Sequence, residues 1–408
     1  MYKLFIPDEY IAHYNKVLSA PVEIKQNLHV RAVPNGIVAV DIKNETFGVC
    51  DANGKFIPES AHRRNNTYRK RAVPHCNPDK VRHIDADAVY CDGGWWVRHF
   101  GHLLCEGLNR TYPILDKKYR NCKYVFVLPG NDEIPSYSME ILNLLGIPRE
   151  NIICAHDSMS FNTLYVPTQA TDLCAYSSRE MADICRTIAD NVPDDGEHYD
   201  KIYVSRLAMG ARKIFGEERI QKIFENNGYH VIYPEQLSVA RQISLMRHCK
   251  YLAGCAGTAL HLALFMRPGG TVIQLKRNTD VGDSVAVQNL INLINQTVGL
   301  DFVLIWTSVE STPTDHFTDC PQIIGATKYF TDFLKWAKFK FSYQDLFVDA
   351  RTVHEYNVML SAYNKTHSKT FARRVKKLIA RLCSCWVPGR SRRKSAREFF
   401  EKILKYNN

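Results

Sequence analysis

Long apolar runs are missing from this chain of 408 residues. No segment approaches the roughly 20 uncharged apolar residues that a membrane-spanning helix needs. The opening residues 1–9 are too short an apolar stretch, and too soon acidic, for a secretion signal. Apolar residues make up 45% of the chain and charged residues 23%, which is typical of a soluble globular protein.

Paired cysteines are also missing. The 13 cysteines are scattered, and none forms a Cys-x-x-Cys pair. An odd number without framework spacing argues against disulfides and against a zinc site, and favours reduced thiols in a reducing compartment. We therefore expect the protein in the cytoplasm.

Excess charge is absent from most of the chain and concentrated at its end. Residues 371–408 hold twelve Lys or Arg and two Glu, which accounts for +10 of the net charge of +11. Apolar residues recur there at helical spacing, so we expect a basic amphipathic tail that docks on an anionic membrane surface. The alternative is that this helix packs back on the first domain. We expect no nucleic-acid partner, because the rest of the sequence adds no basic patch.

The order of expected elements indicates an α/β fold. Strands and helices alternate from about 201 to 306, the signature of βαβ units on a parallel sheet. A polar stretch at 192–197 is the best linker. The sequence thus predicts two Rossmann-like domains facing a cleft. The first has a β-rich start (1–192) and the second spans 198–322, followed by a helical segment (323–370) and the basic tail (371–408).

The second domain carries the features of a diphosphate site, so we expect it to hold a nucleotide donor and the first domain to hold the acceptor. Arg206 closes a strand, Arg212 follows, and Gly257 opens a helix after a second strand. Arginine forks and helix-start amides both bind phosphate oxygens. We therefore predict that the donor contacts Arg206, Arg212, Gly257, Thr258 and Ala259, with Glu235 at the ribose. The alternatives are surface ion pairs of the arginines with Glu217 or Glu218, a plain helix start, and a solvated Glu235.

Four blocks of the sequence resemble glycosyltransferase family 61, in the family's order. They are 203–206 with Arg212 and Glu217, then 228–238, then 257–269, and upstream 99–106 with its Phe-Gly-His…Glu pattern. The resemblance implies an inverting transferase of the two-domain GT-B architecture without an essential metal. It departs from the family at Ala256, where a histidine is usual, and at Gly216, where asparagine is usual; the form seen here resembles that of bacterial members.

Inverting transfer needs a base for the acceptor hydroxyl and positive charge or dipoles for the leaving diphosphate. We predict His102 as the base and Glu106 as the second choice, with His99 on the same helical face and Trp96 on the acceptor side. The alternatives are a core role for His102, a pairing of Glu106 with Arg110, and core packing for the tryptophan. We expect no metal and no cofactor, because no Asp-x-Asp triplet follows an apolar strand.

These observations predict a glycosyltransferase that moves a sugar from a nucleotide sugar to a glycan or a lipid-linked glycan. Its setting would be the synthesis of a surface polysaccharide, such as capsule or lipopolysaccharide, at the cytoplasmic membrane face. Two alternatives stay open. One is a polysaccharide pyruvyl-type transferase, and the other is an inactive glycan-binding or assembly protein, which the loss of the histidine at Ala256 keeps in view.

Overall fold

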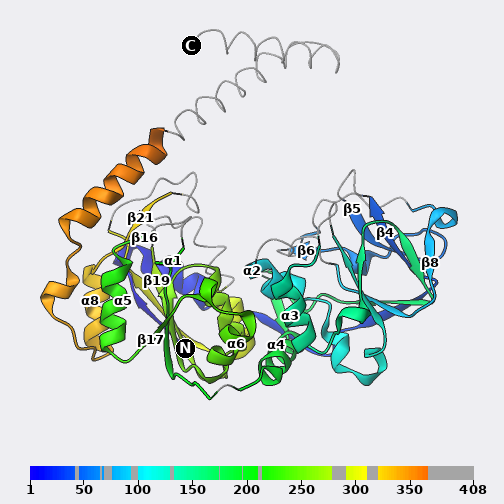
Figure 1. Ribbon diagram of the computed structural model, residues 1–408, viewed down its shortest axis with the longest axis horizontal. Helices are drawn as coiled ribbons and strands as arrows, with labels where there is room; N and C mark the ends of the chain where they lie inside the picture. The colour runs from blue at the N-terminus through cyan, green and yellow to red at the C-terminus, as the bar shows by residue number, and fades with distance from the viewer. Residues whose placement is uncertain are drawn as a thin grey trace, which may run out of the picture.

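The computed structural model shows a mixed α/β protein with two lobes, drawn in Figure 1. The predicted α/β class is therefore confirmed. The structure describes residues 1–41, 46–64, 67–68, 76–92, 100–128, 133–173, 175–194, 196–209, 214–277, 291–309 and 320–365.

A six-stranded sheet forms the centre of the C-terminal half. All its neighbouring strands run parallel, in the order β17 (His230–Ile232), β15 (Lys201–Val204), β18 (Tyr251–Cys255), β19 (Thr271–Lys276), β20 (Asp301–Trp306) and β1 (Tyr2–Phe5). The chain thus contributes its first strand to the sheet of the second half. The domain boundaries at 192, 198, 322 and 370 remain predictions, to which the structure adds this early strand.

Helices cover both faces of this sheet, because successive strand residues point to opposite sides. Ile202 and Val204 face one cluster, with α1 (Asp8–Leu18), α6 (Val239–His248), the 3-10 helix η8 (Thr258–Phe265) and residues 291–298. Tyr203 faces the other, with α5 (Glu217–Asn226) and α8 (Lys328–Trp336). The second half is therefore a doubly wound sheet.

The first half has a five-stranded sheet with a parallel core. Its order is β11 (Ile152–Ala155), β10 (Lys123–Val127), β9 (Ala88–Tyr90), β13 (Thr163–Pro167) and the antiparallel edge strand β3 (Val30–Pro34). A four-stranded sheet packs on one face, in the order β5 (Thr46–Cys50), β4 (Ile37–Asp41), β12 (Met159–Phe161) and β8 (Arg82–Ile84).

This half departs from the predicted Rossmann-like pattern. Helices α3 (Ser136–Leu144) and α4 (Arg179–Asn191) cover only the other face of the five-stranded sheet. The β-rich segment before residue 60 explains the difference, since its alternating strands bury their apolar face against that sheet instead of leaving it to helices.

The two halves share one hydrophobic core. Helices α3 and α4 of the first half pack against α6 of the second, and Figure 1 shows these helices between the lobes. Short elements complete the described chain: β2 (Glu23–Lys25), β14 (Tyr176–Ser178), β6 (Arg63–Arg64), β7 (Thr67–Tyr68), β16 (Ile214–Phe215), β21 (Gln322–Ile323), η1 (Pro58–Ser60), η2 (Pro78–Lys80), η4 (Tyr112–Leu115), η5 (Lys117–Tyr119), η6 (Arg149–Asn151), η7 (Pro234–Gln236), η10 (Tyr343–Leu346) and the helical residues 350–365.

Ser178 caps α4 by accepting from the amide of Met181, and Glu180 accepts from the amide of Leu28. The segment 323–370, expected as helical, contains β21, α8, η10 and the helix at 350–365 among its described residues. Among the residues described, none of the helices is long and apolar enough to cross a membrane. The tail at 371–408 lies outside them.

Candidate functional site

The parallel sheet of the second half reverses its winding direction between β15 and β18. From β15 the chain crosses to β17 on one side, then returns to β18 and continues to β19 and β20 on the other. Ligands of such sheets bind beyond the carboxyl ends of the strands at this reversal. Arg206 and Gly257 lie there, each two residues past the end of its strand.

The side chain of Arg206 packs directly on Gly257. A Cβ atom on this glycine would lie only 2.6 Å from Nη1 of Arg206. Arg206 is buried, and within the described chain its Nε has no hydrogen-bond partner. A buried donor of this kind is costly unless a ligand or water satisfies it. The predicted phosphate residues on the two strands are thus brought together.

A buried carboxyl supports the loop that carries Arg206. Oε1 of Glu217 accepts from the amide of Arg206 at 3.1 Å and from the hydroxyl of Tyr203 at 3.2 Å. Burial raises the pKa of Glu217 to about 7, although the hydrogen bond from Arg206 and that from Tyr203 act in the opposite direction. Glu217 therefore does not form the surface ion pair considered from the sequence. It is buried, and it supports the loop that carries Arg206.

Gly216 explains one departure from the family pattern. Its φ is +82°, in the left-handed region, and a Cβ would lie 2.2 Å from the carbonyl oxygen of Ile324. Asparagine tolerates this backbone conformation better than most residues, but only glycine fits so close an approach. Glycine in place of the usual asparagine is therefore required by the packing of this chain.

The helix predicted to begin at Gly257 is present, and it is the 3-10 helix η8. Thr258 and Ala259 at its start are half-buried, so solvent reaches them. The first amides of a 3-10 helix, like those of an α-helix, lack carbonyl partners within the helix and can meet an anion. Glu235 lies exposed in η7, just beyond β17 at the same edge of the sheet.

A second polar cluster lies in the first half, after β9. His102 ends the short helix α2 (Phe100–His102), and Glu106 lies in the π-helical turn η3 (Leu103–Gly107). Nδ1 of His102 is 2.5 Å from Oε2 of Glu106, which also accepts from Arg64 at 3.1 Å. Nε2 of His62 is 3.3 Å from the other oxygen of Glu106, and its Nδ1 is 2.9 Å from Asp92.

The charges of this cluster alternate. Burial alone would lower the pKa of His62, but the carboxylates of Asp92 and Glu106 raise it to about 9. Burial alone would raise the pKa of Glu106, but hydrogen bonds from His102 and His62 and the charge of Arg64 hold it well below its usual range. At neutral pH Glu106 is therefore a carboxylate that accepts protons poorly and orients His102 well.

The alternative partner for Glu106 is engaged elsewhere. Arg110 donates to the carbonyl oxygens of Pro167 and Ala61. The π-helical turn brings Glu106 toward His102 and His62 instead.

The two clusters meet where α2 contacts η8. A Cβ on Gly101 would lie 2.7 Å from Cγ2 of Thr258 and 2.9 Å from Nδ1 of His261. Sγ of Cys105 lies 3.8 Å from the same His261 nitrogen. His102, the predicted base, is therefore the residue directly after Gly101, which lies against the predicted phosphate-binding turn.

Several residues of the site carry no local sequence signal. His62, Arg64 and Asp92 lie far from Glu106 along the chain, and only the fold joins them. Lys276 is the last residue of β19 and Arg277 follows it, at the same sheet edge as Gly257. Lys276 is buried with its ammonium 5.2 Å from the ring centre of Trp306, and Arg277 donates to Gln322 at 2.8 Å. The sequence signal that could have identified Lys276 and Arg277 is that two basic residues stand together at the carboxyl end of a third parallel strand.

The remaining predicted site residues, His99, Trp96 and Arg212, lie outside the described residues.

Comparison with models of protein families shows what the chain is similar to. Residues 100–273 match the model of the family described as Glycosyltransferase 61. The matched span includes His102, Glu106, Arg206 and Gly257. A comparison with curated proteins finds no match.

Proposed function

We propose that this chain, a glycosyltransferase that belongs to glycosyltransferase family 61 through residues 100–273, transfers a sugar with inversion from a nucleotide sugar to a glycan or lipid-linked glycan. The observation that carries the proposal is the contact of Gly101 with Thr258. This contact sets a histidine–carboxylate pair beside a turn suited to a diphosphate. The family match favours glycosyl transfer over pyruvyl transfer, and the intact pair supports turnover over binding alone.

His102 acts as the base in this proposal. Glu106 accepts a hydrogen bond from Nδ1–H of His102, so the basic lone pair of the imidazole is on Nε2. Nε2 takes the proton of the acceptor hydroxyl, and the hydroxyl oxygen forms a bond to the anomeric carbon. The bond from that carbon to the diphosphate breaks in the same step, which inverts the configuration. Glu106 serves as a positioning residue, because its low pKa makes it a poor base.

The leaving diphosphate is stabilised by fixed positive groups. Arg206 offers a planar fork, and the first amides of η8 offer a dipole end. Lys276 and Arg277 add positive charge at the same edge of the sheet. Because these groups can neutralise the developing charge, we propose that transfer requires no metal ion. We also propose that the two halves act in the manner of a GT-B enzyme, with the donor on the second half.

The setting of the reaction rests on the sequence of the tail. We propose that residues 371–408 hold the enzyme on an anionic membrane surface, where a lipid-linked acceptor for surface polysaccharide is available. Flotation with phosphatidylglycerol vesicles would test this. The full chain should float with them at low salt, and a chain ending at residue 370 should not; equal flotation of both would contradict the role of the tail.

The transfer step is tested with His102→Ala in an assay of a nucleotide-sugar panel. Loss of a general base should lower kcat by about 10²- to 10⁴-fold. The affinity for the product nucleoside diphosphate should stay unchanged, since the base contacts the acceptor and not the phosphates. His83→Ala is the matched control, because this histidine lies away on β8 and bonds Ser160 and Asn162. Undiminished turnover by His102→Ala would overturn the assignment.

A further inference from the structure

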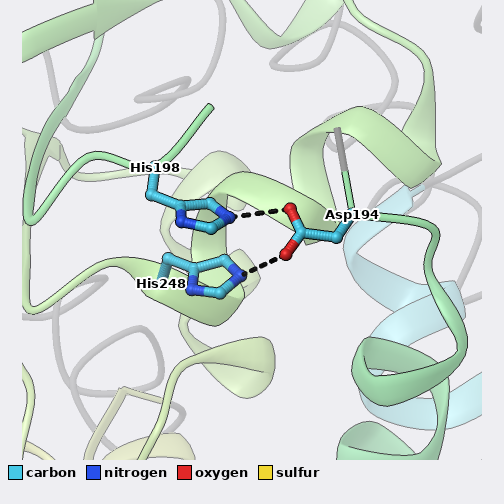
Figure 2. A group of neighbouring side chains, drawn as sticks. All are labelled: Asp194, His198 and His248. Atoms are coloured by element: carbon cyan, nitrogen blue, oxygen red, sulfur yellow. Dashed lines mark hydrogen bonds and ion pairs between the residues drawn. The ribbon is translucent and has the colours of Figure 1, made fainter. Parts of the chain in front are cut away.

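Three side chains meet where the linker between the two halves leaves α4. Asp194 lies in this linker, His198 directly follows it, and His248 is the last residue of α6. Figure 2 shows the two imidazole rings stacked and facing the same carboxylate. The ring centres are 3.6 Å apart with an interplanar angle of 19°. Nε2 of His198 is 2.7 Å from Oδ1 of Asp194, and Nε2 of His248 is 3.9 Å from Oδ2.

The chemistry of these atoms is that of a metal ligand set. One ligand atom from each residue lies within 4.8 Å of the other two. Two imidazole nitrogens and a carboxylate are the ligands that divalent transition metals such as Zn²⁺ take in proteins. Two stacked imidazoles repel each other when both are protonated, whereas a metal ion binds both in the neutral form.

We propose that Asp194, His198 and His248 bind a divalent transition-metal ion such as Zn²⁺. Three protein ligands leave at least one coordination position for water. Access from solvent is available, since His198 and His248 line a surface groove of about 570 Å³. The ion would connect Asp194 and His198 to His248 at the end of α6, and so fix the linker to the second half.

The neighbouring charges set the strength of this site. Nε of Arg247 is 3.2 Å from Nε2 of His248, and its Nη2 is 3.5 Å from Oδ2 of Asp194. This guanidinium must turn away when the ion binds. Two further cations of the groove are already paired, Lys250 with Asp200 at 3.0 Å and Arg267 with Asp190 at 2.6 Å. The ion therefore competes mainly with Arg247, which implies binding weaker than at a closed structural zinc site.

The proposed ion lies apart from the transfer site. His248 precedes the amino end of β18, whereas Gly257 follows its carboxyl end. Five strand residues separate the two ends, which corresponds to about 17 Å. The ion consequently takes no part in the transfer step, and its presence is compatible with metal-independent chemistry. This inference rests on Asp194, His198 and His248 and does not depend on the proposed mechanism.

The test uses the full chain without a polyhistidine tag, freed of metal by chelation and titrated with Zn²⁺. Calorimetry should show one equivalent bound, and the melting temperature should rise with the Zn²⁺ concentration. His198→Ala and His248→Ala should each weaken binding by more than about tenfold, a loss seen even for residues that only support a metal ligand. The exposed His354→Ala is the matched control and should bind as the wild type does.

Folding and ligand identity are checked separately. Circular dichroism of the metal-free variants should match the wild type, because the three side chains lie at the surface and not in the core. Co²⁺ in place of Zn²⁺ should give the visible absorption of a four- or five-coordinate site in the wild type, and that spectrum should be lost in His248→Ala. Wild-type affinity in both histidine variants, or no stoichiometric binding below about 100 µM Zn²⁺, would overturn the proposal.

Discussion

At the scale of single residues, Glu217 connects the donor site to the stability of the fold. Its carboxyl is fully buried beneath Arg206 and accepts from the amide of that residue. Burial raises its pKa to about 7. In the unfolded chain a glutamate releases its proton near pH 4.3. The folded protein therefore keeps a proton that the unfolded chain loses, and the free energy of unfolding falls as the pH rises from about 4.3 to about 7.

Glu217→Gln should remove this pH dependence, because the amide cannot ionise and its oxygen can still accept from Arg206 and Tyr203. The unfolding free energy of the variant relative to the wild type should increase from pH 5 to pH 8 by at most about 3 kcal/mol, and its relative melting temperature should rise with it. Differential scanning fluorimetry at unit pH steps measures it. Glu235→Gln, an exposed carboxylate, is the control. A difference that does not change with pH would contradict the account of Glu217.

At the scale of elements, the turn from β18 into η8 shapes the predicted phosphate site. Gly257 has an extended φ of 162°, which any residue adopts, so its importance is one of space and not of backbone strain. The atom that a Cβ would meet is the far end of the Arg206 side chain, 2.6 Å away. A larger residue here would displace the guanidinium and leave the sheet in place.

Gly257→Ala should therefore weaken nucleoside diphosphate binding by about tenfold or more while changing the melting temperature little, since a side-chain tip can move at low cost. Isothermal calorimetry with the diphosphate that binds the wild type measures the first effect. Because both changes act through one guanidinium, the double variant with Arg206→Ala should bind no more weakly than Arg206→Ala alone. Additive losses of affinity in the double variant would contradict this account, because they would show that Gly257 acts independently of Arg206.

Sequence patterns predicted the elements of the second half well. Apolar runs with turn residues after them predicted β15 and β18, and both lie side by side in the sheet. Carboxyl ends of parallel strands share one edge, so Arg206 and Gly257 could be brought together without a structure. The 3-10 form of η8 could not be predicted, because apolar residues continue around the whole helix and give no period.

The cluster around Glu106 shows where sequence reasoning ends. His102 and Glu106 are four residues apart, so one helical turn predicts their contact. His62 is 44 residues from Glu106 and 30 from Asp92, and nothing local pairs them. Their contacts depend on how β9, η3 and the segment before β6 come together. Asp92 has a φ of +60°, a left-handed conformation that the sequence does not reveal.

At the scale of the whole molecule, the proposed transfer depends on how the two halves are placed. At the site, Gly101 of the first half lies against Thr258 and His261 of the second. A continuous core joins the halves through α3, α4 and α6. The packing of these helices therefore sets the separation between the His102–Glu106 pair and the turn at Gly257.

Gly101→Ala should push α2 away from η8, since its Cβ would lie 2.7 Å from Cγ2 of Thr258. A misplacement of about 1 Å can cost on the order of 10²-fold in turnover, and we expect a loss of that order in kcat. Thr258→Ser removes the clashing methyl and should restore part of the activity in the double variant. Wild-type kcat in Gly101→Ala would show that the two halves need not approach so closely.

The most direct test of the central claim is a thermal-shift panel of nucleoside diphosphates and nucleotide sugars, with a chelator present, on the wild type, His102→Ala and Arg206→Ala. The account expects one nucleoside diphosphate to raise the melting temperature of the wild type and of His102→Ala. The same nucleotide should leave the melting temperature of Arg206→Ala unchanged, even if the chelator alone changes the melting temperature measured without nucleotide. An equal shift in Arg206→Ala, or no shift with any nucleotide, would contradict a donor site at this edge of the sheet.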